Sequence, residues 1–395
     1  MEPAQQNRPT FNFANISIPG FSRFNEHNYS LKMKIFWACA IISCFVGCLC
    51  QIVDRVMLYL ETPVGITMDV VRMQTVNFPA ITICSGQLHD ELWNRKAADD
   101  EKANMTANDI WDYYKVSLDS VTVSVPCWSS TDDDHCEADM LVPFDHIDKK
   151  TLNTIWGKCI ILIPNKTIEY RGPFTKIVIR LDMQEFNNTS RVRERLTVFL
   201  HTPEAAIRHD AFFYADFLIL NNLHVVRILS KEFQFLNTPR NHCISETEAR
   251  NCRDSCIDNL LEGNLTCKLP FMTDSKQEMC DNWTKTKSAY NISVQIYSDL
   301  RVGECQCPRI CNEKVYTTSL DDTGHNGNLT IISLYYSDNY HEIIKEKYTY
   351  VFSALISDIG GNLGLFLGAC ILTLMEVVET LVRRLAWPIN QKNSK

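Results

Sequence analysis

The segment Ser357–Cys370 combines residue types that a plain membrane anchor does not need. It opens a long apolar run with one acid, Asp358, and it carries glycines at 360, 361, 364 and 368. Glycines four apart lie on one face of a helix and let two backbones approach closely. An ionisable residue within a membrane segment marks a functional site by default. The pattern therefore predicts a helix that lines a pore.

Two apolar segments are candidates for crossing a membrane. Neither Ile35–Ile52 nor Ile359–Met375 contains a charged residue. A span needs about 20 apolar residues, so each segment is long enough if its helix continues past the uncharged part. The first begins too far into the chain for a cleaved signal peptide, and no small-residue cleavage site follows it. Two buried helices of a soluble core fit less well, because such helices are usually shorter and more amphipathic.

The charges beside these segments and the composition between them predict the orientation. Lysines 32 and 34 precede the first segment, and arginines 383 and 384 follow the second, so both flanks are expected in the cytosol. The middle contains 12 of the 17 cysteines, an even number, as expected for an oxidised domain. It also carries glycosylation sequons at Asn104, Asn165, Asn187, Asn188, Asn264, Asn282, Asn291 and Asn328.

We therefore divide the chain into five parts. These are a cytosolic N-terminus (1–34), a first transmembrane helix (35–54), an extracellular cysteine-rich domain (55–352), a second transmembrane helix with the pore (353–380) and a cytosolic C-terminus (381–395). The formal net charge of −8 argues against a nucleic-acid partner, which normally requires a basic protein. The sequence thus predicts a multi-pass protein of the plasma membrane.

The extracellular cysteines could form disulfides or bind zinc. They are Cys84, Cys127, Cys136, Cys159, Cys243, Cys252, Cys256, Cys267, Cys280, Cys305, Cys307 and Cys311. Zinc sites favour a reduced compartment and two-residue spacings, whereas the sequons indicate secretion. We expect disulfides and no metal site, although spacing alone leaves their pairing open.

Hydrophobic patterns predict a mixed α and β domain between two membrane helices. Strands are expected at Lys176–Met183, Leu196–His201, Val225–Leu236, Asn291–Tyr297 and Leu329–Tyr336. Helices are expected at Ala107–Tyr114 and at Glu246–Leu261, the latter capped by Ser245 and stopped by Gly263. The fold class is an α+β membrane protein with a disulfide-rich, β-containing ectodomain.

Four motifs resemble the degenerin/epithelial sodium channel family, which includes the acid-sensing ion channels. They are Phe78–Cys84, the Cys305-x-Cys307-x3-Cys311 cluster, Asn328–Tyr336 followed by Tyr340–Tyr348, and Ser357–Cys370. Together they span nearly the whole chain, and the last is the most specific. The resemblance implies a homotrimer or heterotrimer whose ectodomain has palm, thumb and finger regions.

The resemblance also implies a disulfide pairing by position. It pairs Cys84 with Cys159, Cys127 with Cys136, Cys243 with Cys311, Cys252 with Cys307, Cys256 with Cys305, and Cys267 with Cys280. All twelve extracellular cysteines are used.

The same resemblance assigns roles in the pore. It implies a selectivity filter at Gly368, Ala369 and Cys370, and a gate and outer pore at Ser357, Asp358, Gly360, Gly361 and Gly364. It places Glu376 and Glu379 at the inner mouth and a gating motif at Pro19 and Gly20. Backbone carbonyls of the filter would replace water around the ion, and Asp358 would concentrate cations.

Three residues depart from the family pattern. Cys370 occupies the filter position where the family has serine, so ion preference is affected first. Pro19 replaces the histidine of the N-terminal motif. Arg240 stands three residues before Cys243, where acid-sensing relatives carry a tryptophan that couples the thumb to the membrane.

The sequence therefore predicts a trimeric, sodium-preferring, amiloride-sensitive cation channel with both termini cytosolic. Its partners would be sodium ions, the membrane, like subunits and an extracellular ligand, and its stimulus protons, a peptide or force. The alternative is a non-conducting receptor with two anchors, or a modulatory subunit of a heteromeric channel. An ATP-gated channel would need clustered lysines for triphosphate, which we do not find. The motifs G-x-S-x-G, H-E-x-x-H and the P-loop are absent, so we expect neither an enzyme nor a cofactor.

Overall fold

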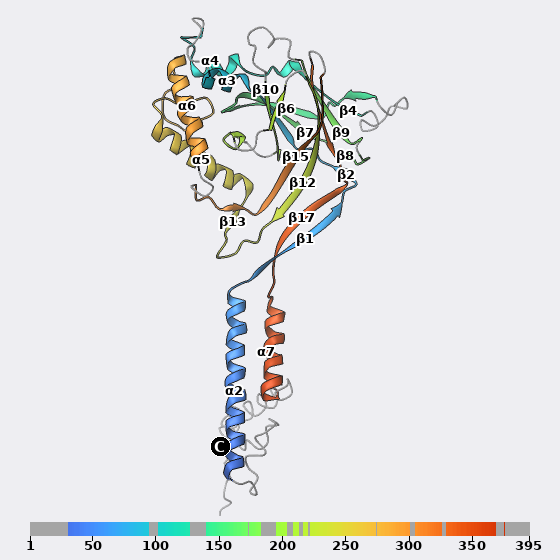
Figure 1. Cartoon of the computed structure of the whole chain (residues 1–395), viewed down its shortest axis with the longest axis vertical. Coiled ribbons are helices and arrows are strands. Elements are labelled where there is room, and N and C mark those ends of the chain that lie inside the picture. Colours follow the sequence, from blue (N-terminus) through green and yellow to red (C-terminus); the bar gives the residue numbers. More distant parts are fainter. Residues whose placement is uncertain are drawn as a thin grey trace, which may run out of the picture. The chain divides into compact units, whose positions relative to one another are not determined.

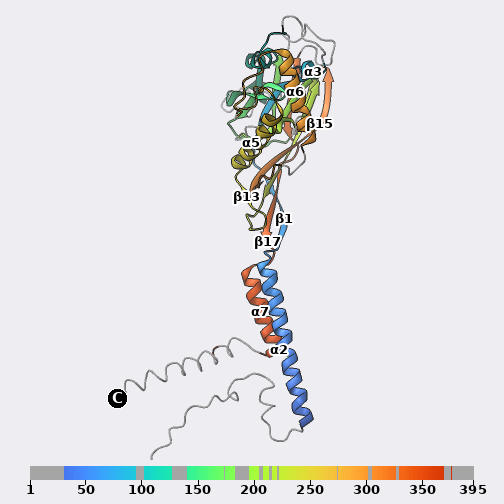
Figure 2. The same cartoon turned by 90° about the vertical axis from the view of Figure 1, so that its left-hand side faces the viewer.

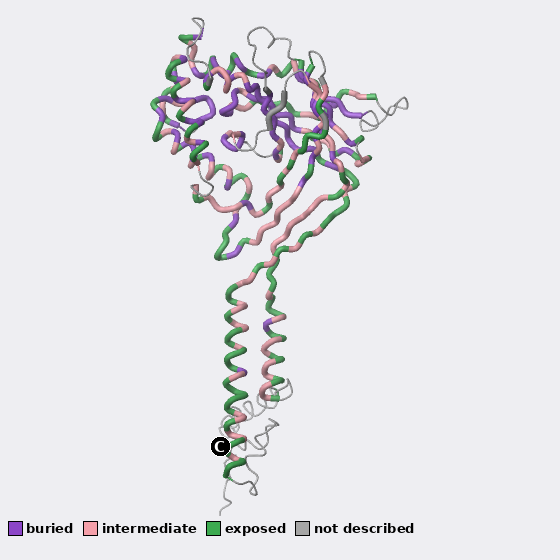
Figure 3. Tube along the Cα trace, viewed as in Figure 1, coloured by how far each residue is buried: buried purple, intermediate pink, exposed green. Residues whose placement is uncertain are grey.

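The structure is a computed structural model, and it divides into two compact units. The ranges described are 31–94, 102–126, 140–172, 174–182, 195–203, 208–212, 216–219, 222–273, 275–300, 305–325, 329–368 and residue 375. The helical unit comprises residues 1–65 and 347–395, and the sheet unit comprises residues 66–346. Buried residues are concentrated in the sheet unit, whereas the two helices of the helical unit are mostly exposed (Figure 3).

Two apolar helices lie side by side in the helical unit (Figures 1 and 2). Helix α2 spans Leu31–Leu60 and is long and apolar enough to cross a membrane. Helix α7 spans Phe352–Leu367 and is also apolar, but its 16 residues extend only ~24 Å. Helix α2 extends to Leu60, beyond residue 54, where the first transmembrane helix was predicted to end.

An eight-stranded sheet forms the larger layer of the sheet unit (Figure 1). Its main path is β1 (Val64–Arg72), β17 (Tyr340–Tyr348), β12 (Asn222–Gln234), β16 (Leu329–Tyr336), β9 (Lys176–Asp182), β4 (Val121–Pro126) and β5 (Leu141–Pro143). Strand β15 (Asn312–His325) pairs with β12 outside this path. The predicted strands in β9, β12 and β16 are confirmed, because their alternating apolar residues face the core.

A five-stranded sheet shares its buried core with the larger sheet. Its order is β11 (Asp216–Ile219), β10 (Arg195–His201), β3 (Ala80–Ser85), β7 (Gly157–Pro164) and β6 (Ile147–Thr154). Ile81 and Val198 from this sheet join Ile179 and Ile332 from the other in one buried cluster. The minor pairs β2 (Thr75–Val76) with β8 (Ile168–Glu169), and β13 (Cys243–Ile244) with β14 (Arg309–Ile310), complete the described strands.

Four helices surround a second core. They are α3 (Gln87–Asn94), α4 (Ala107–Tyr113), α5 (Glu246–Asn264) and α6 (Trp283–Asp299), and their largest buried side chains are aromatic. Ser245 begins α5 through the predicted cap, and it exchanges hydrogen bonds with Glu248 in a capping box. The helix continues through Gly263 to Asn264, three residues past the predicted end at Leu261, so the predicted stop at Gly263 is wrong.

The strand predicted at Asn291–Tyr297 is wrong, because these residues belong to helix α6. Ile292, Val294 and Ile296 occupy alternate positions in this short window, which gives it the two-residue period of a strand. Over the whole helix the buried residues follow the helical period instead: Thr286, Ala289, Tyr290, Ser293, Val294 and Tyr297. Asn282 caps the start of the helix by accepting a hydrogen bond from the Lys285 N–H.

Disulfides crosslink the sheet unit, and two of them join α5 to the segment before β14. Five of the six bridges that the resemblance implies are present: Cys84–Cys159, Cys243–Cys311, Cys252–Cys307, Cys256–Cys305 and Cys267–Cys280. The sixth, Cys127–Cys136, lies outside the described residues. Within the described ranges no group of residues is placed to hold a metal ion. The ten described cysteines of the sheet unit are therefore structural crosslinks.

Candidate pore segment and the strands beside it

The small residues of α7 lie on one uncovered face of the helix. Ser357, Gly360, Gly361, Gly364 and Gly368 are all exposed within the chain. Their spacing places them on one side, and Phe366 and the buried Leu355 lie on the other. A Cβ added at Gly360 or Gly361 would meet no atom within 4 Å. Among the described residues, none therefore covers this face.

The opposite face of α7 packs against α2. A Cβ added at Gly47 would lie 3.2 Å from the ring of Phe366, so glycine permits this close approach of the two helices. The rings of Tyr59 and Phe352 meet edge to face, with centroids 6.2 Å apart. Thr349 donates from both its backbone N–H and its hydroxyl to the carbonyl of Pro63. These contacts join the end of α2 to the start of α7.

Asp358 lies at the flank of the small-residue face and is held by groups of its own chain. Its Oδ2 accepts a hydrogen bond of 2.7 Å from the Tyr350 hydroxyl and lies 3.9 Å from Nε of Arg55. Arg55 also lies 3.7 Å from Asp54, so the guanidinium is shared between two carboxylates. Sequence reasoning predicted the acid but not Tyr350 or Arg55, because neither belongs to the motif.

Helix α7 ends where the filter tripeptide is expected. Gly368 adopts φ 61° and ψ 19°, a left-handed conformation that glycine adopts without strain, and its N–H bonds to the carbonyl of Gly364. The other predicted filter and inner-pore residues, Ala369, Cys370, Glu376 and Glu379, lie outside the described residues. Pro19 and Gly20 of the predicted N-terminal gating motif also lie outside the described residues.

An ion pair connects the cysteine cluster with the strand that precedes α7 in the chain. Both oxygens of Glu346 accept hydrogen bonds of 2.8 Å, from Nη1 and Nη2 of Arg309. The carboxylate also accepts from the Leu236 N–H, and the guanidinium lies 4.6 Å from the ring centroid of Phe235. The hydrogen bonds from Arg309 lower the pKa of Glu346. Arg309 lies inside the Cys305–Cys311 motif, but no sequence signal indicated its partner.

A histidine joins the neighbouring strands β12 and β17. His341 Nδ1 lies 3.0 Å from the hydroxyl oxygen of Ser230, and its Nε2 lies 3.2 Å from a carboxylate oxygen of Glu232. Partial burial opposes ionisation of Glu232, but hydrogen bonds from Gln234 and His341 outweigh it and lower the pKa of the carboxyl. The sequence did not single out His341, because its two partners come from another strand.

The predicted glycosylation sites differ in accessibility. Asn104, Asn165 and Asn264 are exposed, whereas Asn282 and Asn291 are half-buried. Asn282 caps α6, and the Oδ1 of Asn291 is buried in the same helix. The sequons at Asn187, Asn188 and Asn328 lie outside the described residues. Asn104, Asn165 and Asn264 therefore offer the freest positions for a glycan.

Comparison with known proteins identifies the family. The family described as amiloride-sensitive sodium channel matches residues 13–141 and 89–380. The bile acid-sensitive ion channel of Mus musculus is 21% identical, with 91% of this chain and 84% of that protein aligned. The acid-sensing ion channel 1A of Danio rerio is 20% identical, with 93% of this chain and 87% of that protein aligned.

A solved structure of a proton-activated chloride channel aligns with 88% of this chain and 98% of its own, at 7% identity. Its TM-score of 0.33 is too low to support an inference. The family match instead extends over most of the chain and includes α7 and the cysteine cluster. The chain therefore belongs to the amiloride-sensitive sodium channel family, that is, the degenerin/epithelial sodium channel family of ion channels, and is not an enzyme.

Proposed function

We propose that the chain is one subunit of a trimeric, sodium-preferring, amiloride-sensitive cation channel of the plasma membrane. In this proposal α2 and α7 both cross the bilayer, both termini are cytosolic, and the sheet unit is extracellular. The eight-stranded sheet would be the palm, and α5 with α6 would form the thumb. Like subunits surround the pore, each contributing its α7.

The observation that carries the proposal is the uncovered small-residue face of α7. Ser357, Gly360, Gly361 and Gly364 are exposed on the side away from Phe366, which packs on α2. Small residues in a membrane helix permit close approach of another helix, or of hydrated ions, to the backbone. The left-handed Gly368 at the helix end also agrees with a filter of exposed carbonyls beginning there. A single subunit supplies only one such face, so a pore requires several copies.

Opening would follow motion of the sheet unit, because strands β1 and β17 continue in the chain toward α2 and α7. In the closed state Tyr350 and Arg55 hold Asp358, which reduces the charge that it presents to cations. A stimulus that draws β17 outward would act on the residues just before Tyr350. Relatives named for acid and bile acid sensitivity support an extracellular stimulus.

Expression in oocytes under voltage clamp tests this function. We expect Ser357→Trp to hold the pore open and to produce a current that falls when sodium is replaced by N-methyl-D-glucamine or when amiloride is added. The matched control is Ile356→Trp, since Ile356 is exposed but lies off the small-residue face. The absence of any current from Ser357→Trp, with the protein shown at the cell surface, would refute a homomeric channel.

A further inference from the structure

A groove of about 350 Å³ runs along strand β15 within the sheet unit. Six consecutive residues of the strand, Glu313–Thr318, form one wall, and Phe199–Thr202 at the end of β10 form another. Asp210, Arg250 and Arg253 line it from the loop before β11 and from α5. The groove therefore follows a strand edge over a length of ~20 Å.

The edge of β15 that borders this groove is not paired with a described strand, although the end of β10 lies close to it. Among the strands that the structure describes, β15 pairs with β12 alone. An unpaired edge presents a row of backbone N–H and C=O groups that another extended chain can pair with. Proteins that bind peptides by adding a strand to a sheet use such an edge, with side-chain pockets beside it for specificity.

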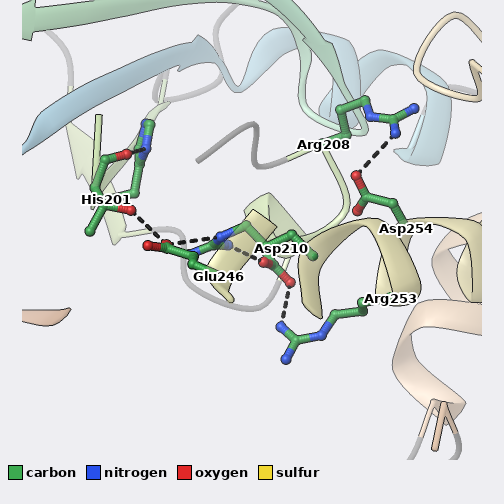
Figure 4. Close-up of polar contacts among 8 residues, drawn as sticks. His201, Arg208, Asp210, Glu246, Arg253 and Asp254 are labelled. Atoms are coloured by element: carbon green, nitrogen blue, oxygen red, sulfur yellow. Dashed lines mark hydrogen bonds and ion pairs between the residues drawn. The ribbon is translucent and has the colours of Figure 1, made fainter. Parts of the chain in front are cut away.

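The wall opposite the edge is preorganised by a network of ion pairs (Figure 4). Asp210 accepts hydrogen bonds of 2.6 Å from Arg250 and 2.8 Å from Arg253. Glu246 accepts from Arg250 at 2.7 Å and from the Thr202 hydroxyl at 2.6 Å. Two arginines thus face two carboxylates, and the charges of this wall cancel.

The histidine of the wall adds no charge near neutral pH. His201 Nδ1–H donates to the Thr202 carbonyl, and its Nε2 accepts from the Thr82 hydroxyl, which is the arrangement of a neutral ring. Burial lowers its pKa to about 4. Nearby, Arg208 pairs with Asp254 and so fastens the same loop to α5 (Figure 4).

One carboxylate of the groove remains without a partner. The side chain of Glu313 forms no hydrogen bond or ion pair within the described ranges, and burial raises its pKa although Arg250 and Arg253 act in the opposite sense. The next residue, Lys314, also lines the groove, but its charge is balanced by Glu232, which lies opposite it on β12. The side of the groove toward α5 therefore has a surplus of one negative charge. Beside it Ile310 and Val315 supply apolar surface.

We propose that this groove binds an extended peptide segment of a partner protein, which adds to β15 as a further strand. A lysine or arginine of the peptide pairs with Glu313, and an apolar side chain two positions away contacts Ile310 and Val315. Backbone pairing along the edge supplies affinity, and the basic residue supplies selectivity. This binding site is separate from the pore, so it can be tested without a measurement of channel current.

Thiol labelling of the full-length protein in lipid nanodiscs tests the proposal. Val315→Cys places a thiol in the groove, and Leu320→Cys, exposed on the same strand but outside the groove, is the matched control. Wild-type protein measures the background from its other cysteines, which include the four free cysteines of α2. The probe is acetyl-Val-Thr-Lys-Thr-Val-amide, with one variant carrying Glu for Lys and one N-methylated at alternate backbone nitrogens.

We expect the lysine peptide to slow labelling at position 315 and not at position 320. The Glu variant should protect about thirtyfold less well, because one pair of unit charges at about 4 Å in water changes from attraction to repulsion, and each contributes a factor of about five. Glu313→Gln should abolish this difference between the peptides, and N-methylation should abolish protection by either. Retention of the five described disulfides, checked by mass spectrometry without reduction, verifies the fold of each variant.

Two results would overturn the proposal. One is equal protection, or none, by all three peptides in a correctly folded protein. The other is labelling at position 315 that is slow in the assembled protein without peptide but fast after the subunits are dissociated. That second result would mean that a neighbouring copy of the chain, not a separate peptide, occupies the groove.

Discussion

Removing the ion pair between Arg309 and Glu346 should loosen strand β17 from strand β14. The pair is bidentate, with two hydrogen bonds of 2.8 Å, and Arg309 also donates to the carbonyl of Leu236. The side chains of Arg309 and Glu346 are 30% and 15% exposed, so solvent screens the pair only in part. The pair lies between strands that are distant in sequence, and local structure cannot replace it.

The expected size follows from this geometry. A hydrogen bond to a charged group contributes ~1.5–3 kcal/mol when well buried, and an exposed ion pair usually contributes less than ~1 kcal/mol. For this partly buried pair we expect Arg309→Gln to reduce the free energy of opening by about 2 kcal/mol. Arg309→Lys should recover less than half of that loss, because an ammonium cannot form the two parallel hydrogen bonds.

Hydrogen–deuterium exchange of peptides from β17 is the measurement, made on Arg309→Gln, Glu346→Gln and the double variant. The coupling energy from this cycle should be about 1 kcal/mol or more. Peptides from β6, which lies in the other sheet, provide the internal control. Additive effects of the two single substitutions would show that the pair does not hold β17, and the reasoning would be wrong.

The pair also predicts a dependence on pH. Arg309 lowers the pKa of Glu346 in the folded state, so its contribution is fully present above the unfolded pKa of ~4.3. This contribution to stability is lost only as the pH falls through the pKa of Glu346 in the folded state, which is the lower of the two values. Protection of β17 by this pair should therefore be constant from pH 7 to pH 5 and decline below pH 4. A loss between pH 7 and pH 6 would point to another group.

Two further substitutions test packing and burial. Gly47→Leu should reduce thermal stability in nanodiscs by the equivalent of ~1–3 kcal/mol, because the new side chain meets Phe366. A second substitution, Phe366→Ala, should restore the stability. Failure of that rescue would mean that the two helices do not touch there. His201 is buried with a pKa near 4, below its unfolded value of ~6.5, so its contribution to stability is present above pH 6.5 and declines toward pH 4. The loss at pH 5 relative to pH 7 should be about 2 kcal/mol, measured by urea unfolding, and His201→Gln should remove that part of the slope. An unchanged slope would show that His201 is not the group that titrates.

Much of the local structure could be predicted from the sequence. The apolar run before Gln51 predicts a long helix, and Ser245 with Glu248 predicts where α5 begins. Strands β9, β10 and β16 follow from alternating apolar residues. These features depend on neighbours within a few residues, so a single sequence contains the information. The exception, Asn291–Tyr297, fails because seven residues satisfy the strand period and the helical period equally well.

The features of the candidate pore segment also divide into those that the sequence determines and those that the tertiary structure determines. The sequence by itself determined the residue types of the pore segment: one acid, a series of small residues and a glycine at the helix end. Only the tertiary structure decided which face of α7 remains uncovered, since that depends on the packing of Phe366 against Gly47 of a helix some three hundred residues earlier. The partners of Asp358 and Glu346 were likewise decided by tertiary structure. Charges far apart in sequence meet only after the chain folds, and spacing along the chain contains no signal for such distances.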